Sequence, residues 1–472
     1  MGECKVVTWV CAASAVWIGL AGCVYSTQSR ASGWLVVETR HIQLRTNIDR
    51  GAAVRFAREM QSSYEVLARH ALPCAPRGDQ DRVQVTVLPY WQFAEIAGSG
   101  AGGFYLRAGV TWLADHGGQI VLPDDLGPRS RQFFQHEMTH RLVESCFVRP
   151  PAWLNEGLAG FFETMLVESD RVTIGRPPYV IKTAGPRTPR SVMVGGQRIW
   201  IVSLNTLPSI DSVFGLTGLL AHDWRESPPR YATAWALVHF LALGAPDLNP
   251  RFEAYLSALQ AAGSDPQRLF AKLFEDVPLQ DRLNEYLSRG SFDLLQSTHP
   301  FVEPGEAGSG PRVRDMPEDE AHVHLAWLGA RAGDPGSRER FVRHVAAAKQ
   351  NPRTRAAAHL VAAYARLSNR DLAGAEGEVQ AGLRGAPDSP ALLEAELDVL
   401  LARKAGAGEL AMAAGRLRPV ARTAGAVCSL ALAALRTGDR ASATELAERG
   451  LQLDPRGIGC RDVGELAAAR TR

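Results

Sequence analysis

A His-Glu-Met-Thr-His run at residues 136–140 carries the clearest chemical signal in this sequence. In an α-helix, residues four positions apart share a face, so His136 and His140 can direct their imidazole nitrogens at one metal ion. Glu137 lies one residue round from that face, where its carboxylate can reach a metal-bound water. Catalytic zinc takes three protein ligands and leaves a fourth position open. Glu156, sixteen residues after the second histidine, is the candidate third ligand, and the pattern predicts a zinc metallopeptidase.

The residues around this run distinguish a metal site from an ordinary amphipathic helix with solvated or hydrogen-bonded histidines. The neighbouring positions are strongly apolar and predict a largely buried helix: Phe133, Phe134, Met138, Leu142 and Val143. Ionisable groups on a buried helix need a partner, and a metal ion is the commonest explanation. The flanks therefore favour the metal site.

Residues 136–163 resemble the gluzincin peptidases, in particular the peptidase MA-like group. That group carries the same histidine motif, then a proline and a Trp-Leu-x-Glu-Gly-Leu-Ala sequence. Residues 151–159 match it as Pro-Ala-Trp-Leu-Asn-Glu-Gly-Leu-Ala. Residues 231–241 are similar to a Tyr-Ala-x-x-Trp-Ala-Leu helix of the same group. The likeness spans about residues 34–295, and these blocks are its specific part.

The resemblance implies that His136, His140 and Glu156 bind one catalytic Zn²⁺ ion and that Glu137 is the general base. Many larger gluzincins also carry an acidic residue one turn after the third ligand, which orients the histidines. This sequence has Gly160 at that position, so the orienting groups must come from elsewhere in the chain.

The oxyanion formed during peptide hydrolysis needs a donor beside the metal. Tyr231 is the candidate, because a phenol on a later helix can reach over the metal; a core tyrosine with an anchored hydroxyl is an equally weighted alternative. His239 falls on the same helical face and is an outside candidate. A lone histidine between Val238 and Phe240 is more typical of a hydrogen-bonded core residue.

Residues 1–22 have the pattern of a secretory signal peptide, with Lys5, an apolar run and a Leu-Ala-Gly ending before Cys23. The ending resembles a bacterial lipobox, which implies cleavage before Cys23, lipid attachment to that cysteine and a polar tether over residues 23–33. An uncleaved membrane anchor is the alternative, although the run is short for a span. The lipobox resemblance thus implies a lipid-anchored protein of the bacterial cell envelope. No aspartate follows Cys23, which implies a location at the outer membrane if the host has one.

Four cysteines remain once the signal peptide and Cys23 are set aside: Cys74, Cys146, Cys428 and Cys460. An even number in an oxidising compartment favours disulfides, and pairing within each half of the chain is the least demanding arrangement. Four buried free thiols are nearly as compatible with the sequence.

A net charge of +2 with 22% charged residues gives no basic field for nucleic acid.

The length of the chain predicts several domains. A chain of 472 residues should hold at least two. A Pro/Gly-rich stretch predicts a linker over residues 301–317. Before it, residues 34–300 mix strands and helices, and the resemblance implies an α+β zincin-like domain with a mixed sheet beside the zinc helix. Strands are expected near residues 34–37, 42–45, 83–87, 104–107 and 119–122, and a helix over 50–70.

In zincin folds, the substrate pairs with the edge strand nearest the active-site helix. By that resemblance, residues 103–112 or 119–122 would hold the extended peptide. The glycine-rich residues 98–103 lack the lysine of a phosphate-binding loop, so a loop at the mouth of the cleft is the favoured interpretation.

Residues 318–472 are rich in alanine, leucine and arginine and are expected to be all-helical. Residues 382–387 match 450–455 at an offset of 68, twice the 34-residue period of tetratricopeptide repeats, and Ala375 and Ala443 keep the same offset. Such repeats commonly bind peptides or protein partners; a plain helical buttress is the alternative.

Two functions fit these features. The first is a lipid-anchored zinc peptidase that acts on a peptide or protein substrate and holds a protein partner on its repeats. The second is a surface scaffold whose repeats bind partners and whose zinc domain is catalytically weak. Glu137 favours the enzyme, because a scaffold has no use for a general base beside a metal. A peptidase kept shut until a partner binds is compatible with both halves.

Overall fold

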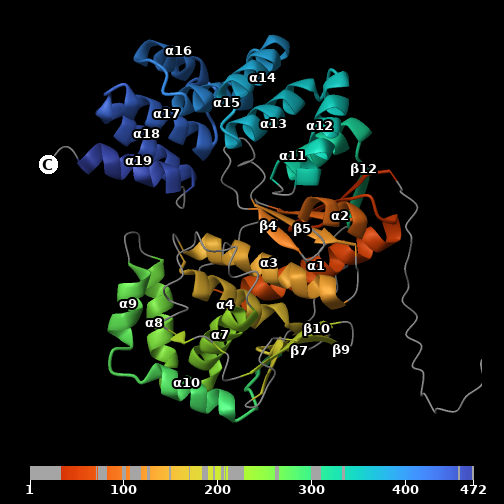
Figure 1. The fold of residues 1–472 in the computed structure, drawn as a ribbon, viewed down its shortest axis with the longest axis vertical. Helices are drawn as coiled ribbons and strands as arrows, with labels where there is room; N and C mark the ends of the chain where they lie inside the picture. Colours follow the sequence, from red (N-terminus) through yellow and green to blue (C-terminus); the bar gives the residue numbers. More distant parts are fainter. Residues whose placement is uncertain are drawn as a thin grey trace, which may run out of the picture.

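The computed structural model describes residues 33–469, except for 71, 73–81, 98–102, 107–117, 125–127, 148–149, 169–170, 183–189, 195–196, 204–206, 208, 211–227, 261–264, 299–309, 332–334 and 455–457. The predicted signal peptide, Cys23 and the tether up to residue 32 lie outside the described residues. The chain forms an α+β part followed by an all-helical part, one above the other in Figure 1. Within the described ranges, no helix is both long and apolar enough to cross a membrane.

A six-stranded mixed sheet forms the centre of the α+β part. Its order is β12 (Arg312–Asp315), β1 (Leu35–Glu38), β2 (Ile42–Thr46), β3 (Val83–Leu88), β5 (Gln119–Pro123) and β4 (Phe104–Leu106). Strands β2, β3 and β5 are parallel, whereas β12, β1 and β4 pair antiparallel with their neighbours. The strands expected from the sequence are confirmed.

The helices of this part lie around the sheet and below it in Figure 1. They are α1 (Arg50–His70), α2 (Tyr90–Ala97), α3 (Pro128–Cys146), α4 (Ala152–Glu163), α7 (Pro228–His239), the π-helix η4 (Phe240–Gly244), α8 (Asn249–Leu259), α9 (Pro266–Leu273) and α10 (Leu279–Ser288). Two three-stranded sheets accompany them, one of β8 (Tyr179–Lys182), β10 (Gln197–Ser203) and β9 (Arg190–Val194), the other of β11 (Leu295–Thr298), β7 (Arg171–Ile174) and β6 (Leu166–Val167).

The edges of the six-stranded sheet correct two expectations. Residues 312–315, predicted as linker, form edge strand β12, in which Asp315 pairs with Leu35. The α+β part therefore extends beyond residue 300. At the other edge lies β4, while β5 pairs on both sides, so residues 119–122 have no open edge for a substrate. Residues 107–112, the rest of the other predicted substrate segment, lie outside the described residues.

Both faces of this sheet are covered, which explains why every residue of β5 is buried. Ile120 and Leu122 point to one face and pack in a core with Phe56 of α1 and Met138 of α3. Val121 points to the other face and joins a second core with α2 and with the first helices of the helical part. Side chains alternate between the two faces of a strand, so each face of this sheet needs its own cover. The helical part supplies the cover on the face of Val121.

The helical part is a series of helix pairs. Its members are α11 (Glu318–Arg331), α12 (Pro335–Gln350), α13 (Arg355–Ser368), α14 (Leu372–Gly385), α15 (Pro390–Ala402), α16 (Ala407–Leu417), α17 (Ala424–Arg436), α18 (Arg440–Leu453) and α19 (Ile458–Ala469). Helices α13, α15, α17 and α19 begin 34 or 35 residues apart. Ala375 and Ala443 are fully buried, and a Cβ on Gly382 would lie 2.8 Å from Leu392, so the matched positions need small side chains.

One disulfide closes the end of this series. Cys428 of α17 is bonded to Cys460 of α19, which confirms the pairing expected within the C-terminal half. A side chain at Gly450 would collide with Cys460. Cys146 is also disulfide-bonded, and Cys74, its expected partner, lies outside the described residues.

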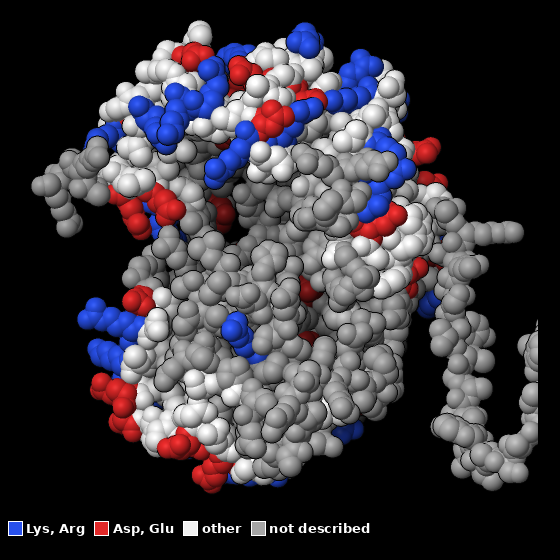
Figure 2. Space-filling view, in the orientation of Figure 1, with Lys and Arg blue, Asp and Glu red and all other residues white. Residues whose placement is uncertain are grey.

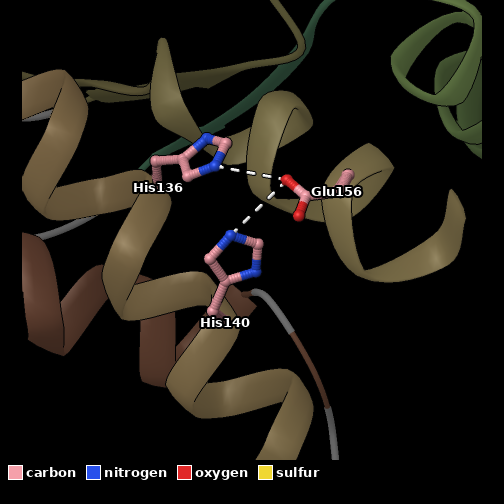
Figure 3. A group of neighbouring side chains, drawn as sticks. All are labelled: His136, His140 and Glu156. Carbon is pink, nitrogen blue, oxygen red and sulfur yellow. Dashed lines mark ion pairs between the residues drawn. The ribbon is translucent and has the colours of Figure 1, made fainter. Parts of the chain in front are cut away.

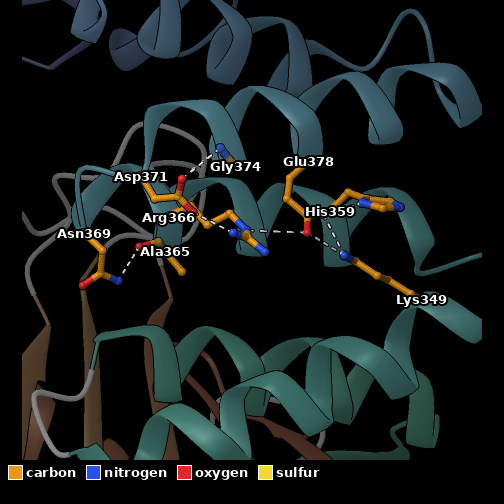
Figure 4. Close-up of polar contacts among 8 residues, drawn as sticks. All are labelled: Lys349, His359, Ala365, Arg366, Asn369, Asp371, Gly374 and Glu378. Atoms are coloured by element: carbon orange, nitrogen blue, oxygen red, sulfur yellow. Dashed lines mark hydrogen bonds and ion pairs between the residues drawn. The ribbon is translucent and has the colours of Figure 1, made fainter.

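A charged cluster joins α12, α13 and α14 (Figure 4). Glu378 accepts hydrogen bonds of 2.7 Å from Lys349 and from His359, and Arg366 lies 3.8 Å away. Burial alone would raise the pKa of Glu378, but the bonds from Lys349 and His359 lower it below its ordinary value. The cluster therefore fastens α12, α13 and α14 to one another through a single carboxylate.

Candidate metal centre

Helices α3 and α4 bring the three predicted ligands together (Figure 3). Glu156 Oε2 lies 3.5 Å from His136 Nε2 and 3.6 Å from His140 Nε2. The three ligand atoms all lie within 4.8 Å of one another, and among the described residues no other group of three or more His, Cys, Asp or Glu is arranged in this way. The side chains are 13–19% exposed, so a small molecule can still reach them.

The spacing fits a tetrahedral zinc ion. Two ligand atoms bound at about 2.0–2.1 Å with tetrahedral angles lie roughly 3.4 Å apart. The two histidine-to-glutamate distances are close to that value. Two imidazole nitrogens and one carboxylate oxygen are also a donor set that catalytic zinc uses. The two spacings and the donor types of the residues present therefore fit zinc.

Each histidine is oriented through its second nitrogen. His136 Nδ1 lies 2.7 Å from Glu163 Oε2, and His140 Nδ1 lies 3.0 Å from Asn155 Oδ1. Because both partners are oxygen acceptors, each Nδ1 donates a proton to its partner, which leaves Nε2 as the nitrogen that can bind a metal. Glu163 and Asn155 thus occupy the positions from which the two rings can be oriented, which Gly160 has no side chain to do.

Sequence reasoning missed Glu163 and Asn155 as functional residues. Glu163 follows Glu156 by seven positions, two turns of α4, so the two carboxylates lie on one face of that helix. Asn155 directly precedes Glu156. The seven-residue spacing is a signal that could have identified Glu163, whereas the side-chain direction of Asn155 becomes evident only in the folded chain.

The electrostatics of the site favour positive charge at His136. Burial alone would lower the pKa of His136, but hydrogen bonds to Glu156 and Glu163, together with the charges of Glu163 and Glu137, raise it well above its ordinary value. The same carboxylates that stabilise a proton on this ring stabilise a divalent cation beside it.

Helix α4 is held in place by its approach to α7. A Cβ on Gly157 would lie 2.5 Å from the carbonyl oxygen of Ala234, so only glycine allows the two helices to come this close. A Cβ on Gly160 would meet Trp235 at 3.5 Å, an ordinary contact distance. Gly160 therefore faces the α7 interface, where a carboxylate would be buried against an indole.

The two remaining candidate catalytic residues lie on different helices, Glu137 on α3 and Tyr231 on α7. Glu137 is half-buried in α3, next to His136, and contributes to the raised pKa of that ring. Tyr231 is half-buried near the start of α7 and packs against the core of the α+β part. The role of Tyr231 as an oxyanion donor stays a prediction.

His239 is a core residue with both ring nitrogens engaged. Its Nε2 lies 2.9 Å from the carbonyl oxygen of Gly175, and its Nδ1 lies 2.9 Å from the hydroxyl of Tyr286. Nε2 donates to that carbonyl, which leaves Nδ1 of a neutral ring to accept from the Tyr286 hydroxyl. Burial lowers the pKa of His239 to about 4. These contacts favour the structural role expected of a lone histidine among apolar residues.

The edge strand β4 is fastened to the histidine helix. The hydroxyl of Tyr105 in β4 donates a 2.7 Å hydrogen bond to Glu144, one turn beyond His140 in α3. A side chain on Gly118 would collide with the ring of Tyr105. This contact holds β4, an edge strand of the described part of the sheet, alongside α3.

Comparisons with family models, curated proteins and solved structures found no match to this chain.

Proposed function

We propose that this chain is a zinc-dependent peptidase of the gluzincin type. The observation that carries the proposal is the convergence of His136, His140 and Glu156, with the general-base candidate Glu137 in the same helix. The mixed sheet with an antiparallel edge strand beside the histidine helix supports a zincin-like fold.

The residues have distinct roles in the proposed reaction. His136, His140 and Glu156 would hold the zinc ion, which when bound would polarise the scissile carbonyl and acidify the attacking water. Glu137 accepts the proton of that water and passes it to the leaving amine. Glu163 and Asn155 keep the imidazole rings aimed at the ion. Tyr231 donates a hydrogen bond to the oxyanion, and β4 aligns the extended substrate.

The sequence features outside the site complete the proposal. The helix pairs of residues 318–469 are tetratricopeptide-like repeats that bind a protein partner or substrate, as their 34-residue spacing suggests. The signal peptide and Cys23 give the protein a lipid anchor in the bacterial envelope. In the alternative function, a scaffold with weak catalysis, these two features would be retained and the role of Glu137 lost.

The test compares wild type with Glu137→Gln for zinc content and for cleavage of a mixed peptide library. We expect about one zinc ion per chain in both proteins, and a loss of cleavage of at least 100-fold in the variant. Glu168→Gln, at an exposed carboxylate just beyond α4, is the matched control and should retain activity. Equal cleavage by wild type and Glu137→Gln would overturn the general base, and a chain that takes up no zinc would overturn the site.

A further inference from the structure

A small cavity opens between α14, α15 and α16 in the helical part. It has a volume of about 180 Å³, and each of the three helices supplies an acidic residue to its lining: Glu376, Glu396 and Glu409. An engineered cavity of about 150 Å³ holds a benzene molecule, so this one has room for a single long side chain. It lies apart from the metal centre, in a different core of the protein.

The floor of the cavity is apolar and its rim is polar. Val379, Val399, Leu400 and Ala413 form the apolar part, and Met412, which is 71% exposed, stands at the opening. An exposed methionine beside a cavity is available to pack against an incoming chain, because its side chain is unbranched and adaptable.

The rim carries one more carboxylate than guanidinium. Arg416 pairs with Glu396, which also accepts a 3.1 Å bond from Gln380. Arg403 pairs with Glu409, whose other oxygen accepts from the backbone of Gly406 at 3.3 Å. The third carboxylate, Glu376, is 43% exposed and forms an ion pair only with Arg403 among the described residues, at 3.7 Å.

From these observations we propose that the cavity binds a lysine or arginine side chain of a partner polypeptide. A long aliphatic stem ending in a cation matches an apolar floor with a surplus carboxylate at the rim. The stem would cover Leu400 and Ala413 and pack against Met412, and the cation would pair with Glu376. Figure 2 shows acidic and basic side chains interspersed over the upper helices, so recognition comes from this local pairing and not from a broad field.

The cavity lies within the stack of helices. Helices α13, α15 and α17 contact one another in series, and α15 also contacts α14 and α16. The cavity is lined by α14, α15 and α16. The proposal is independent of the proposed peptidase activity.

The test measures binding of three fluorescent peptides by anisotropy, using the full-length chain in a Glu137→Gln background so that no probe is cleaved. The peptides are Ala-Ala-Lys-Ala-Ala and the same sequence with norleucine or glutamate at the centre. We expect the lysine peptide to bind about fivefold more tightly than the norleucine peptide, which has the same stem without the charge. The glutamate peptide should bind most weakly.

Two surface variants locate the binding site. Glu376→Gln should weaken binding of the lysine peptide about fivefold, and Met412→Lys, which places a cation at the opening, should weaken it at least tenfold. Glu448→Gln and Leu453→Lys, at exposed positions of α18, are the controls and should leave binding unchanged. Equal affinity for the lysine and norleucine peptides, no binding of any probe, or binding unaffected by both variants would each overturn the proposal.

Discussion

His136 Nδ1 lies 2.7 Å from Glu163 Oε2, a contact between α3 and the last turn of α4. The same short helix supplies Glu156 from its first half, so one element provides both a ligand and the carboxylate that orients another ligand. A shift of α4 therefore displaces both the ligand Glu156 and the carboxylate that orients His136.

Removing the Glu163 carboxylate should weaken metal binding without removing a ligand. We expect Glu163→Ala to lower zinc affinity by about 10–100-fold, because the His136 ring loses the acceptor that fixes its orientation. Glu163→Gln keeps an acceptor oxygen and should lose less. Competition with a chelator gives the affinities. An unchanged affinity in Glu163→Ala, with Glu168→Ala as the control, would show that the contact has no role in metal binding.

The close approach of α4 and α7 predicts opposite effects at two neighbouring glycines. Gly157→Ala places a methyl group 2.5 Å from the carbonyl oxygen of Ala234 and should destabilise the protein by roughly 1–3 kcal/mol. Gly160→Ala meets only an ordinary contact at 3.5 Å and should be neutral or stabilising by up to about 1 kcal/mol, since alanine favours a helix. Urea denaturation of the two variants tests the difference, and equal stabilities would contradict it.

Cutting the chain before β12 should disrupt the α+β part. A protein ending at residue 311 loses an edge strand and also the helices that cover Val121 and Phe93, so it should aggregate and fail to bind zinc. A protein ending at Gln350 keeps α11 and α12 and should remain soluble and bind zinc. If the shorter protein were folded and bound zinc as tightly as the full chain, the second layer would be dispensable.

Buried His239 predicts that stability falls in mild acid. Burial holds the pKa of His239 at about 4, below its ordinary value near 6.5, so the unfolded chain takes up the proton first as the pH falls. This contribution to stability is complete above pH of about 6.5 and is lost as the pH falls towards 4, by roughly 2–3 kcal/mol. His239→Gln should reduce that slope, measured by urea denaturation at pH 7.5 and 4.5. His344, whose pKa burial also lowers to about 4, contributes to the remaining slope.

The three candidate ligands could be predicted because they lie on two successive helices and are regularly spaced in the sequence. His136 and His140 share one helical face, and the block around Glu156 marks the start of the next helix. The edge strand β12 could not be predicted, because Arg-Val-Arg-Asp has no strand pattern of its own and its partner lies at the other end of the domain. Likewise, the sequence does not show that β4 pairs with residues 119–122 and so occupies the edge that a substrate would need.

The pairing of Leu35 with Asp315 also constrains how the chain folds. During synthesis, β1 is made long before β12, the strand that completes that edge of the sheet. Contacts so distant in sequence form late and at a high entropic cost. Until then, the backbone of β1 offers an unpaired edge to neighbouring chains. Newly made copies of this protein should therefore depend on holding chaperones through most of their synthesis, and a stalled chain of about 300 residues should be the form most prone to aggregate.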